Sequence, residues 1–291
     1  MTQQYLGLPA PAKLNLFLHI TGQRSDGMHN LQSVFQLIDL HDTIDLHWLK
    51  DPIIQRTGDL LCPIEQDLCY RAALALQPYA KITAGVRIHL TKRIPTQAGM
   101  GGGSSDAATT LLGLNRLWQC HLSREKLMKI AITLGADVPF FLLGSNAWVE
   151  GIGEKVTAIN TPESSYLVIW PGVGIPTKKI FSSPLLTKNT KPVIIKFFTE
   201  HNSLHWPQLF GHNDLEPVAK KLEKNLQNLL EWGIMHNLTL RMTGSGSAAF
   251  SPIQDEFKAQ ALLKELPENW QGFITKSLSS HPLSVWGDQT V

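Results

Sequence analysis

A glycine-rich loop is the feature of this sequence that points most directly to chemistry. Residues 95–108 read P-T-Q-A-G-M-G-G-G-S-S-D-A-A, and the helix-like run A-A-T-T-L-L begins at residue 107. Glycine lets the backbone adopt positive φ and approach a ligand closely. The start of a helix offers unpaired N–H groups and a partial positive charge. Together these features predict a phosphate-binding loop.

Two common nucleotide motifs do not fit this loop. A Walker A motif requires Lys followed by Ser or Thr after its last glycine, whereas Ser104 and Ser105 follow Gly103. A dinucleotide fingerprint requires Gly or Ala at the position that Ser104 occupies when the spacing is counted from Gly99 and Gly101. The alternative is a purely structural glycine turn, because most isolated glycine motifs have only that role.

Two charged residues, Lys13 and Asp137, could perform phosphoryl transfer beside such a loop. Asp137 precedes Pro139, which restricts Val138, so it is expected on a short rigid connector. Its carboxylate can accept the proton of an attacking hydroxyl as a general base. Lys13 can keep Asp137 ionised and neutralise charge on the moving phosphoryl group. Each residue alone could be an ordinary strand or loop residue, and their presence together with the loop favours a kinase.

The elements that would position these residues can be predicted from hydrophobic spacing. Strict alternation over 12–20 predicts a half-buried strand with Lys13 and Asn15 on the face opposite its apolar residues. Further strands are expected at 44–48 and 86–90, and the second of these leads into the glycine loop. The remaining predictions for the first half are helices at 107–118 and 123–134, strands at 140–143 and 147–149, and a turn at 151–153.

A composition shift near 160–162 predicts two domains, residues 1–160 and 161–291. The predicted elements of the second half are strands at 166–170, 238–242, 248–250 and 273–276 and helices at 215–232 and 254–266. Their order suggests a split βαβ, ferredoxin-like arrangement, with a second glycine turn at 243–246. Residues 184–212 are polar and irregular and receive no assignment.

Composition indicates which partners and which cellular compartment to expect. The chain has 291 residues and a formal net charge of only +2, so neither nucleic acid nor an anionic membrane is expected as a partner. The three cysteines form no C-x-x-C pair, which fits a reducing compartment. No apolar run is long enough to cross a bilayer, and no signal peptide is recognisable. A cytoplasmic protein is therefore expected.

The glycine motif resembles the phosphate motif of the GHMP kinase superfamily, which includes galacto-, homoserine and mevalonate kinases. Other segments resemble one family within it, the bacterial 4-diphosphocytidyl-2-C-methyl-D-erythritol kinases of the non-mevalonate isoprenoid pathway. These segments are P-A-K-L-N-L-F-L at 11–18, T-G-Q-R-S-D-G-M-H at 21–29, L-G-A-D-V-P-F-F at 134–141, P-G-V-G-I-P-T at 171–177 and R-M-T-G-S-G-S-A at 241–248. The similarity covers most of the chain.

The resemblance implies an α+β, two-domain GHMP kinase fold. Its N-terminal nucleotide-binding domain would be ribosomal protein S5 domain 2-like, and its C-terminal domain ferredoxin-like. It also implies ATP-dependent phosphorylation of the 2-hydroxyl of a small-molecule substrate that carries a cytidine diphosphate group. Mg²⁺ is expected because phosphoryl transfer needs charge neutralisation. Mg²⁺ takes few protein ligands, for which Ser104 or Ser105 is a candidate.

The resemblance also assigns site residues. Lys13 and Asp137 match the catalytic pair, and Asn15, His29, Thr177 and Phe181 match positions associated with the cytidine-containing substrate. The positions that match the ATP-binding loop are Pro95, Thr96, Gln97, Ala98, Gly99, Met100, Gly101, Gly102, Gly103, Ser104 and Ser105.

Two positions depart from the family pattern. Met28 stands where the family usually has Tyr, so a thioether contact is expected in place of one ring of the cytosine pocket. Asp106 stands where Asn or Ala is common. A carboxylate facing the nucleotide would repel phosphate, so Asp106 is expected to face away or to help hold magnesium through water.

Two alternatives stay open at this point. The first is a GHMP kinase that acts on another alcohol, such as homoserine or mevalonate. The second is a non-catalytic binding module on the same fold, because fold does not determine function. The near-neutral charge and the Lys13–Asp137 pair argue against RNA binding. A monomer or weak homodimer is expected.

Overall fold

The computed structural model describes residues 3–287, apart from the side chain of Ser203. The first sheet is built on the long antiparallel pair β1 (Gln4–Gln23) and β2 (His29–Leu49). Along this sheet the strands run in the order β3-β4-β2-β5-β6, and β1 pairs with β2. The shorter strands are β3 (Ile54–Gly58), β4 (Gly85–Thr91), β5 (Ala147–Gly151) and β6 (Lys155–Ala158).

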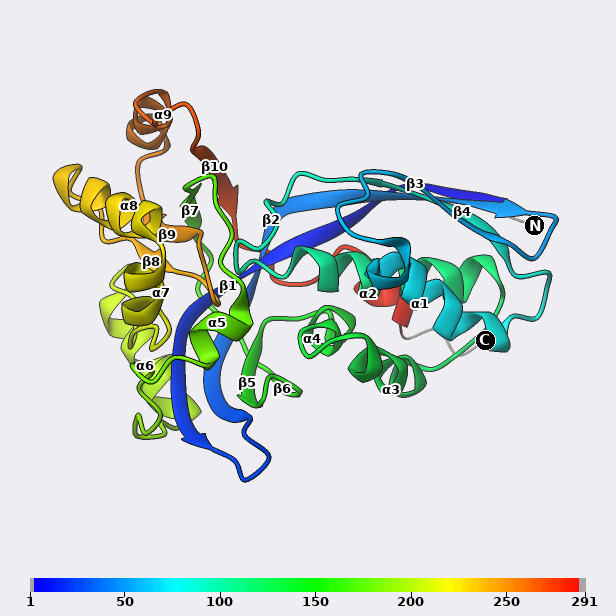
Figure 1. The fold of residues 1–291 in the computed structure, drawn as a ribbon, viewed down its shortest axis with the longest axis horizontal. Helices are drawn as coiled ribbons and strands as arrows, with labels where there is room; N and C mark the ends of the chain where they lie inside the picture. The colour runs from blue at the N-terminus through cyan, green and yellow to red at the C-terminus, as the bar shows by residue number, and fades with distance from the viewer. Residues whose placement is uncertain (1–2, 288–291) are drawn as a thin grey trace.

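Helices α1 to α4 gather on one side of this sheet (Figure 1). They are α1 (Leu68–Leu76), α2 (Gly102–Leu117), α3 (Arg124–Leu134) and α4 (Val138–Leu143), with short 3₁₀ turns at Ile64–Gln66 and Gln77–Tyr79. The helix predicted at 123–134 is confirmed as α3, with Ser123 accepting a hydrogen bond from the Lys126 amide at its N-terminus and Gly135 following its last turn. Helix α2 starts at Gly102, inside the glycine-rich segment and not at the predicted residue 107, so the last residues of that segment form the first turn of the helix.

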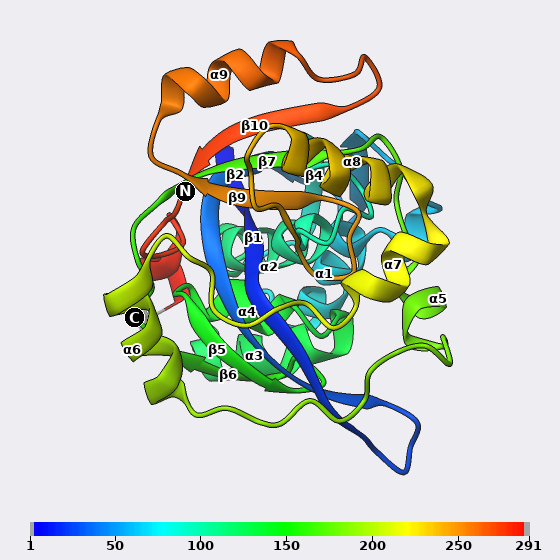
Figure 2. The same ribbon diagram turned by 90° about the vertical axis from the view of Figure 1, so that its left-hand side faces the viewer.

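The second sheet is antiparallel and has the order β10-β7-β9-β8. Its strands are β7 (Ser165–Trp170), β8 (Arg241–Met242), β9 (Ala249–Ile253) and β10 (Gln271–Lys276). The helices of this half are α5 (Thr177–Phe181), α6 (Ile195–His205), α7 (Glu216–Leu222), α8 (Lys224–Met235) and α9 (Glu256–Lys264). Counted within this half, the strand order is 4-1-3-2, so the ferredoxin-like prediction is confirmed. Figure 2 shows α9 beside β10 and the long strands β1 and β2 passing beneath this sheet.

Strand β1 joins the two halves of the molecule. The Leu18 amide donates to the His212 carbonyl at 2.9 Å, and the Asp214 amide donates to the Leu18 carbonyl at 2.8 Å. The first sheet ends at Ala158 and the second begins at Ser165. The domain boundary near residue 160 stays a prediction. After β10 the chain returns to the first half, where Ser280 forms a bridge with Ser145.

The strand predicted at 140–143 is wrong, because these residues form helix α4. A short apolar run is compatible with either a buried strand or a buried helix segment. Pro139 decides the outcome, because it lies in the first turn of α4, where its missing N–H is not needed.

The single helix predicted over 215–232 is also wrong, because two helices replace it. Glu223, with φ −134° and ψ 105°, separates α7 from α8, and its side chain accepts a bond from the Asn225 amide. Gly233 does not end the helix, which continues to Met235. A Cβ at Gly233 would lie 2.7 Å from Leu240, so this glycine permits close packing instead.

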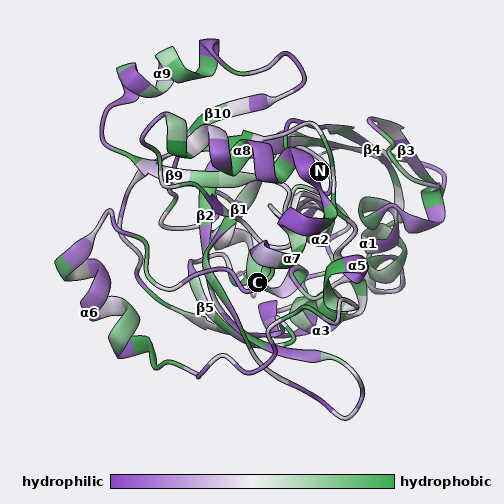
Figure 3. Ribbon diagram, turned by 60° about the vertical axis from the view of Figure 1, so that its left-hand side comes forward, coloured by the Kyte–Doolittle hydropathy of each residue, from purple (hydrophilic) through white to green (hydrophobic). Residues whose placement is uncertain are grey.

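Strand β1 is buried on both faces over most of its length, whereas alternation predicted one solvated face. Helix α6, from the unassigned segment 184–212, explains part of this difference. Phe198 of α6 is 1% exposed, and its ring centroid lies 5.9 Å from that of Phe17. Figure 3 shows that α6 carries hydrophobic and hydrophilic residues side by side. Within residues 3–287, no helix is both long and apolar enough to span a membrane.

Candidate active site

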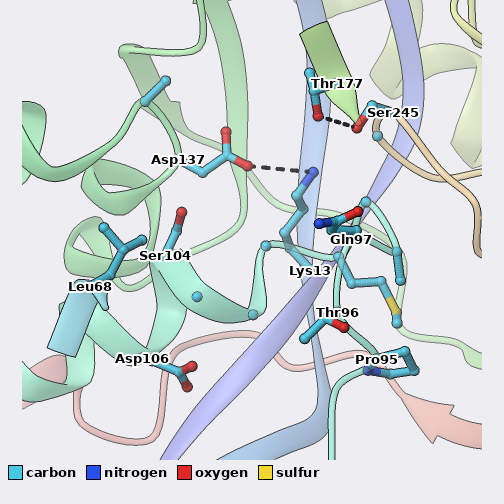
Figure 4. A pocket seen from close by; sticks show the side chains of 18 of the residues that line it. Lys13, Leu68, Pro95, Thr96, Gln97, Ser104, Asp106, Asp137, Thr177 and Ser245 are labelled. Carbon is cyan, nitrogen blue, oxygen red and sulfur yellow. Dashed lines mark hydrogen bonds and ion pairs between the residues drawn. The ribbon is translucent and has the colours of Figure 1, made fainter. Parts of the chain in front are cut away.

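Lys13 of β1 and Asp137, which precedes α4, lie close together in one cavity. The Nζ atom of Lys13 lies 3.8 Å from Oδ2 of Asp137, and the two side chains point toward each other (Figure 4). Asp137 occupies the N-cap position of α4, but its side chain makes no capping hydrogen bond. The carboxylate is therefore available to Lys13 and to a ligand rather than used for capping the helix.

The ammonium of Lys13 is buried in a specific environment. Its side chain is 4% exposed, it donates a short hydrogen bond to Asn15 Oδ1, and it lies 4.4 Å from the centroid of the Phe35 ring. Burial lowers the pKa of Lys13, and the charge of Asp137 partly offsets this effect. Asp137 keeps 32% of its side chain exposed, so the carboxylate can be reached by a substrate.

Asn15 is fixed by residues from both halves of the chain. Its backbone N–H donates to Thr243 Oγ1 at 2.9 Å, and its side-chain Nδ2 donates to Ser33 Oγ at 2.9 Å. Ser33 in turn donates to the Phe17 carbonyl. Thr243 begins the second glycine turn, which was predicted at 243–246. The role of its hydroxyl was not predicted, because spacing within the chain does not show which strand a distant turn contacts.

The glycine loop packs tightly against both Lys13 and the second glycine turn. Gly99 has φ +79°, and a Cβ there would lie 2.1 Å from the Thr243 carbonyl oxygen. Gly101 has φ +72°, and a Cβ there would lie 3.0 Å from the Phe141 ring and 3.3 Å from Cε of Lys13. Both positions require glycine, because the backbone has positive φ and a side chain would clash with neighbouring atoms. Gly101 is also the N-cap of α2, so no side chain caps the first-turn amides that could bind phosphate.

A cavity of about 810 Å³ connects these features. Among the predicted residues, those that line it are Lys13, Asn15, the loop from Pro95 to Ser104, Asp137, Thr177 and Phe181. Ser105 is fully buried and does not line the cavity. Part of the remaining wall comes from Leu61, Cys62 and Leu68, in a region for which the sequence made no prediction.

Phe181, in the wall of this cavity, packs against His29, which does not itself line the cavity. Their ring centroids are 5.4 Å apart at an interplanar angle of 37°. His29 is buried, and its Nε2 has no hydrogen-bond partner among residues 3–287. Burial, with a smaller effect from Lys188, lowers the pKa of His29 and favours the neutral ring. A buried ring nitrogen without a partner is a group that a hydrogen bond from a ligand would satisfy.

Thr177 and Met28 differ in how close they come to the cavity. Thr177 Oγ1 lies 2.8 Å from Ser245 Oγ of the second glycine turn, and both residues line the cavity. Met28 lies in the turn between β1 and β2, is 48% exposed and does not line the cavity. Of the predicted substrate residues, Asn15, Thr177 and Phe181 therefore line the cavity, His29 adjoins it through Phe181, and Met28 lies outside its lining.

Protein ligands for a metal are few at this site. Residues 3–287 contain no group of three or more His, Cys, Asp or Glu side chains arranged to hold a metal ion. Ser104 lines the cavity at the start of α2, and Asp137 lies in the same cavity. One hydroxyl beside a phosphate loop fits Mg²⁺, which keeps several waters and takes substrate phosphates as ligands.

Comparisons with known proteins agree with this geometry. The family model described as GHMP kinases N terminal domain matches residues 67–145, and the model described as GHMP kinases C terminal matches residues 201–272. The 4-diphosphocytidyl-2-C-methyl-D-erythritol kinase of Burkholderia ambifaria is 48% identical over 278 residues, covering 94% of each chain. The kinase of that name from Herminiimonas arsenicoxydans is 49% identical over 280 residues, covering 95% of this chain and 96% of its own.

Solved structures give the same result. A crystal structure of 4-(cytidine 5'-diphospho)-2C-methyl-D-erythritol kinase has a TM-score of 0.81 and 31% identity, covering 94% of this chain and 98% of its own. Homoserine kinase from Cytophaga hutchinsonii has a TM-score of 0.69 at 16% identity, covering 97% and 96%, which shows a shared fold alone. The resemblance drawn from the motifs is confirmed, and this chain belongs to the GHMP kinase superfamily and, within it, to the 4-diphosphocytidyl-2-C-methyl-D-erythritol kinase family.

Proposed function

We propose that this chain transfers the γ-phosphoryl group of ATP to the 2-hydroxyl of 4-diphosphocytidyl-2-C-methyl-D-erythritol, giving the 2-phosphate and ADP. The observation that carries the proposal is the Lys13–Asp137 pair, which lies in one cavity with the glycine loop and with Thr177 and Phe181. The near-50% identity to kinases of that name supports the choice of substrate.

Each catalytic group has one task in this reaction. Asp137 accepts the proton of the 2-hydroxyl as that oxygen forms its bond to phosphorus and the bond to the ADP oxygen breaks. Lys13 stabilises negative charge on the transferred group. The first-turn amides of α2 and the glycine loop hold the phosphates, so catalysis is mainly positioning and electrostatic stabilisation.

Mg²⁺ is part of the proposal. Ser104 would hold the ion together with nucleotide phosphates and water, and when bound the ion would neutralise phosphate charge. Ser105 is not chosen because its hydroxyl is buried away from the cavity, although that hydroxyl has no hydrogen-bond partner within residues 3–287.

The cytidine end of the substrate is assigned to the His29–Phe181 pair. The neutral His29 ring can hydrogen-bond an edge of cytosine, and Phe181 can stack on the face of the base. Thr177 and Asn15 contribute a hydroxyl and an amide on the way from this pair to Lys13. The free cysteines support a reducing cytoplasmic setting. A monomer or weak homodimer suffices because one chain supplies every group named here.

The test is ADP release with Mg-ATP and each of four acceptors: the cytidyl substrate, homoserine, mevalonate and galactose. Turnover with the cytidyl compound alone, lost in Asp137→Asn, is the expected result. Turnover with a different alcohol would retain the kinase family and reject the substrate. Binding of ATP without turnover of any acceptor would reject the proposed reaction.

A further inference from the structure

A second group of buried charges lies outside the Lys13–Asp137 pair. The Nζ atom of Lys92 lies 2.8 Å from Asp106 Oδ2 and also donates a short hydrogen bond to Asp42 Oδ2. Both carboxylate side chains are almost fully buried, at 0% exposure for Asp42 and 4% for Asp106. Figure 4 shows Asp106 pointing away from Lys13 and Asp137. The reaction described above uses none of these three residues, which are called the Lys92 cluster below.

The Lys92 cluster connects the two ends of the glycine loop. Lys92 follows β4 and starts the segment that enters the loop, whereas Asp106 belongs to the second turn of α2, which leaves the loop. Asp42, on β2, accepts hydrogen bonds through Oδ1 from the amides of Arg93 at 2.6 Å and Ile94 at 2.8 Å. Asp42 thus holds the entering segment, and Lys92 links Asp42 to the leaving helix.

The ammonium of Lys92 lies directly beneath the start of α2. A Cβ at Gly102, the first residue of that helix, would lie 3.2 Å from Lys92 Nζ. Lys92 and Asp106 also line the cavity that contains the loop. A change in the Lys92 cluster would therefore first displace the backbone amides in the first turn of α2, which are proposed to bind the phosphates.

The charges of the Lys92 cluster explain how it holds the segments together. Burial alone would lower the pKa of Lys92, but the attraction of Asp106 and Asp42 outweighs it and raises that pKa above its ordinary value. Lys92 is therefore a cation at neutral pH. Burial, together with the charge of Asp42, raises the pKa of Asp106, and Lys92 opposes that shift. Without Lys92, Asp106 would take up a proton rather than remain a second buried charge, and the charge-assisted bridge between Asp42 and α2 would be lost.

We propose that Lys92 is a positioning residue for nucleotide binding, which sets the shape of the glycine loop by bridging Asp42 and Asp106. This inference rests on the proposed function of the same site, because it takes the loop to bind ATP. It does not depend on which alcohol accepts the phosphoryl group. Lys92 acts on the affinity for nucleotide, whereas Lys13 and Asp137 act on the chemical step.

The test compares Lys92→Met with Lys50→Met, a control at an exposed lysine in the turn between β2 and β3. Affinity for a non-hydrolysable ATP analogue with Mg²⁺ is measured by titration calorimetry, and thermal unfolding confirms that each variant is folded. Because breaking a buried ion pair is costly, Lys92→Met is expected to bind the analogue at least about tenfold more weakly, and Lys50→Met like the parent protein. The KM for ATP should rise similarly, with a smaller change in kcat at saturating ATP.

The double variant Lys92→Met/Asp106→Asn provides a second readout. Asp106 is expected to be protonated once Lys92 is gone, so adding Asp106→Asn to Lys92→Met should change analogue affinity by less than about twofold. In the parent protein Asp106→Asn should weaken binding, because Lys92 then loses a charged partner. If Lys92→Met does not fold, the double variant is compared with Asp106→Asn instead and should bind more weakly. Analogue affinity within about twofold of the parent protein in folded Lys92→Met, or an Asp106→Asn effect as large in Lys92→Met as in the parent protein, would overturn the proposal. Because no acceptor is present, failure here is distinct from failure of the proposed reaction.

Discussion

Lys13 Nζ lies 3.8 Å from Asp137 Oδ2 and is held from another direction by Asn15 Oδ1. These partners differ in exposure, because Asp137 keeps about a third of its side chain open to the cavity and Lys13 does not. A carboxylate that is open to the cavity suits a base that must contact the substrate, and the buried ammonium beside it suits a group that stabilises charge on the transferred phosphoryl group. The predictions below separate the roles of these groups.

Asp137→Asn is expected to lower kcat by about 10²–10⁴-fold, because the amide cannot accept the hydroxyl proton. ATP affinity should stay within about threefold, since the loss is confined to the chemical step. Steady-state kinetics and analogue titration measure the two quantities. Asp51→Asn, at an exposed turn, is the matched control. Near-normal kcat in Asp137→Asn would remove this residue from the role of base.

Lys13→Met is expected to abolish most turnover and yet increase the free energy of unfolding at pH 7. Burial lowers the pKa of Lys13 below that of the unfolded chain. Between these two values the unfolded state binds more protons, so the stability of the parent protein rises with pH across that window. The advantage of Lys13→Met should therefore shrink from pH 7 toward pH 10. Denaturant titrations at several pH values test this, and a less stable Lys13→Met at pH 7 would contradict it.

Much of the site was predictable from the sequence because its chemistry resides in local motifs. The glycine loop, Lys13 on its strand and Asp137 before a proline are each recognisable within a few residues, and the structure brings them together. Asp137 was placed correctly on a connector although the element after it was assigned wrongly. The helix α4 and a strand are equally compatible with four apolar residues.

The parts that were not predictable depend on contacts between distant segments. Leu68 reaches the cavity because α1 packs on α2, and no pattern in the sequence shows that contact. The bond from the Asn15 amide to Thr243 and the bridge of Lys92 to Asp42 likewise join strands to remote turns. Short-range periodicity describes one face of one element and contains no information about such pairs.

Phe181→Leu is expected to raise the KM for the cytidyl substrate by roughly tenfold, because a base loses its stacking partner. The KM for ATP should be unchanged, since the glycine loop lies elsewhere in the cavity. Initial rates with each substrate varied in turn separate the two constants. An equal rise in both KM values would mean that Phe181 supports the whole cavity rather than the base.

His29 is expected to make substrate binding sensitive to acid. Its pKa is lowered by burial, so the ring is neutral at pH 7 and gains a proton only at a pH below its ordinary value near 6.5. The unfolded chain binds that proton more readily, so stability also falls as pH drops below about 6.5. The KM for the cytidyl substrate should likewise rise as the pH drops, because the protonated ring binds the base differently. His29→Asn should lose this pH dependence, whereas His121→Asn, at an exposed loop, should retain it.

Met28→Tyr is expected to lower the KM for the cytidyl substrate by only a few-fold. Met28 is about half exposed and lies outside the cavity lining, so a ring there adds contact area without displacing a packed side chain. A thioether–aromatic contact is itself worth roughly 0.3–1.5 kcal/mol, which limits the change. Initial-rate kinetics on the parent protein and on Met28→Tyr measure this change in KM. A large increase in KM would show that the turn at Met28 is already fitted to the base.

Thr243→Val is expected to affect both stability and turnover, because its hydroxyl accepts the Asn15 amide hydrogen bond at 2.9 Å. Valine leaves that buried N–H without a partner, which costs about 1–3 kcal/mol of unfolding free energy. Asn15 would then hold Lys13 less firmly, so kcat should fall more than either KM rises. Thr243→Ser keeps the hydroxyl and should restore kcat, even where the lost methyl group costs some stability. Equal kcat values in the Val and Ser variants would show that this hydrogen bond stabilises the fold without positioning Lys13.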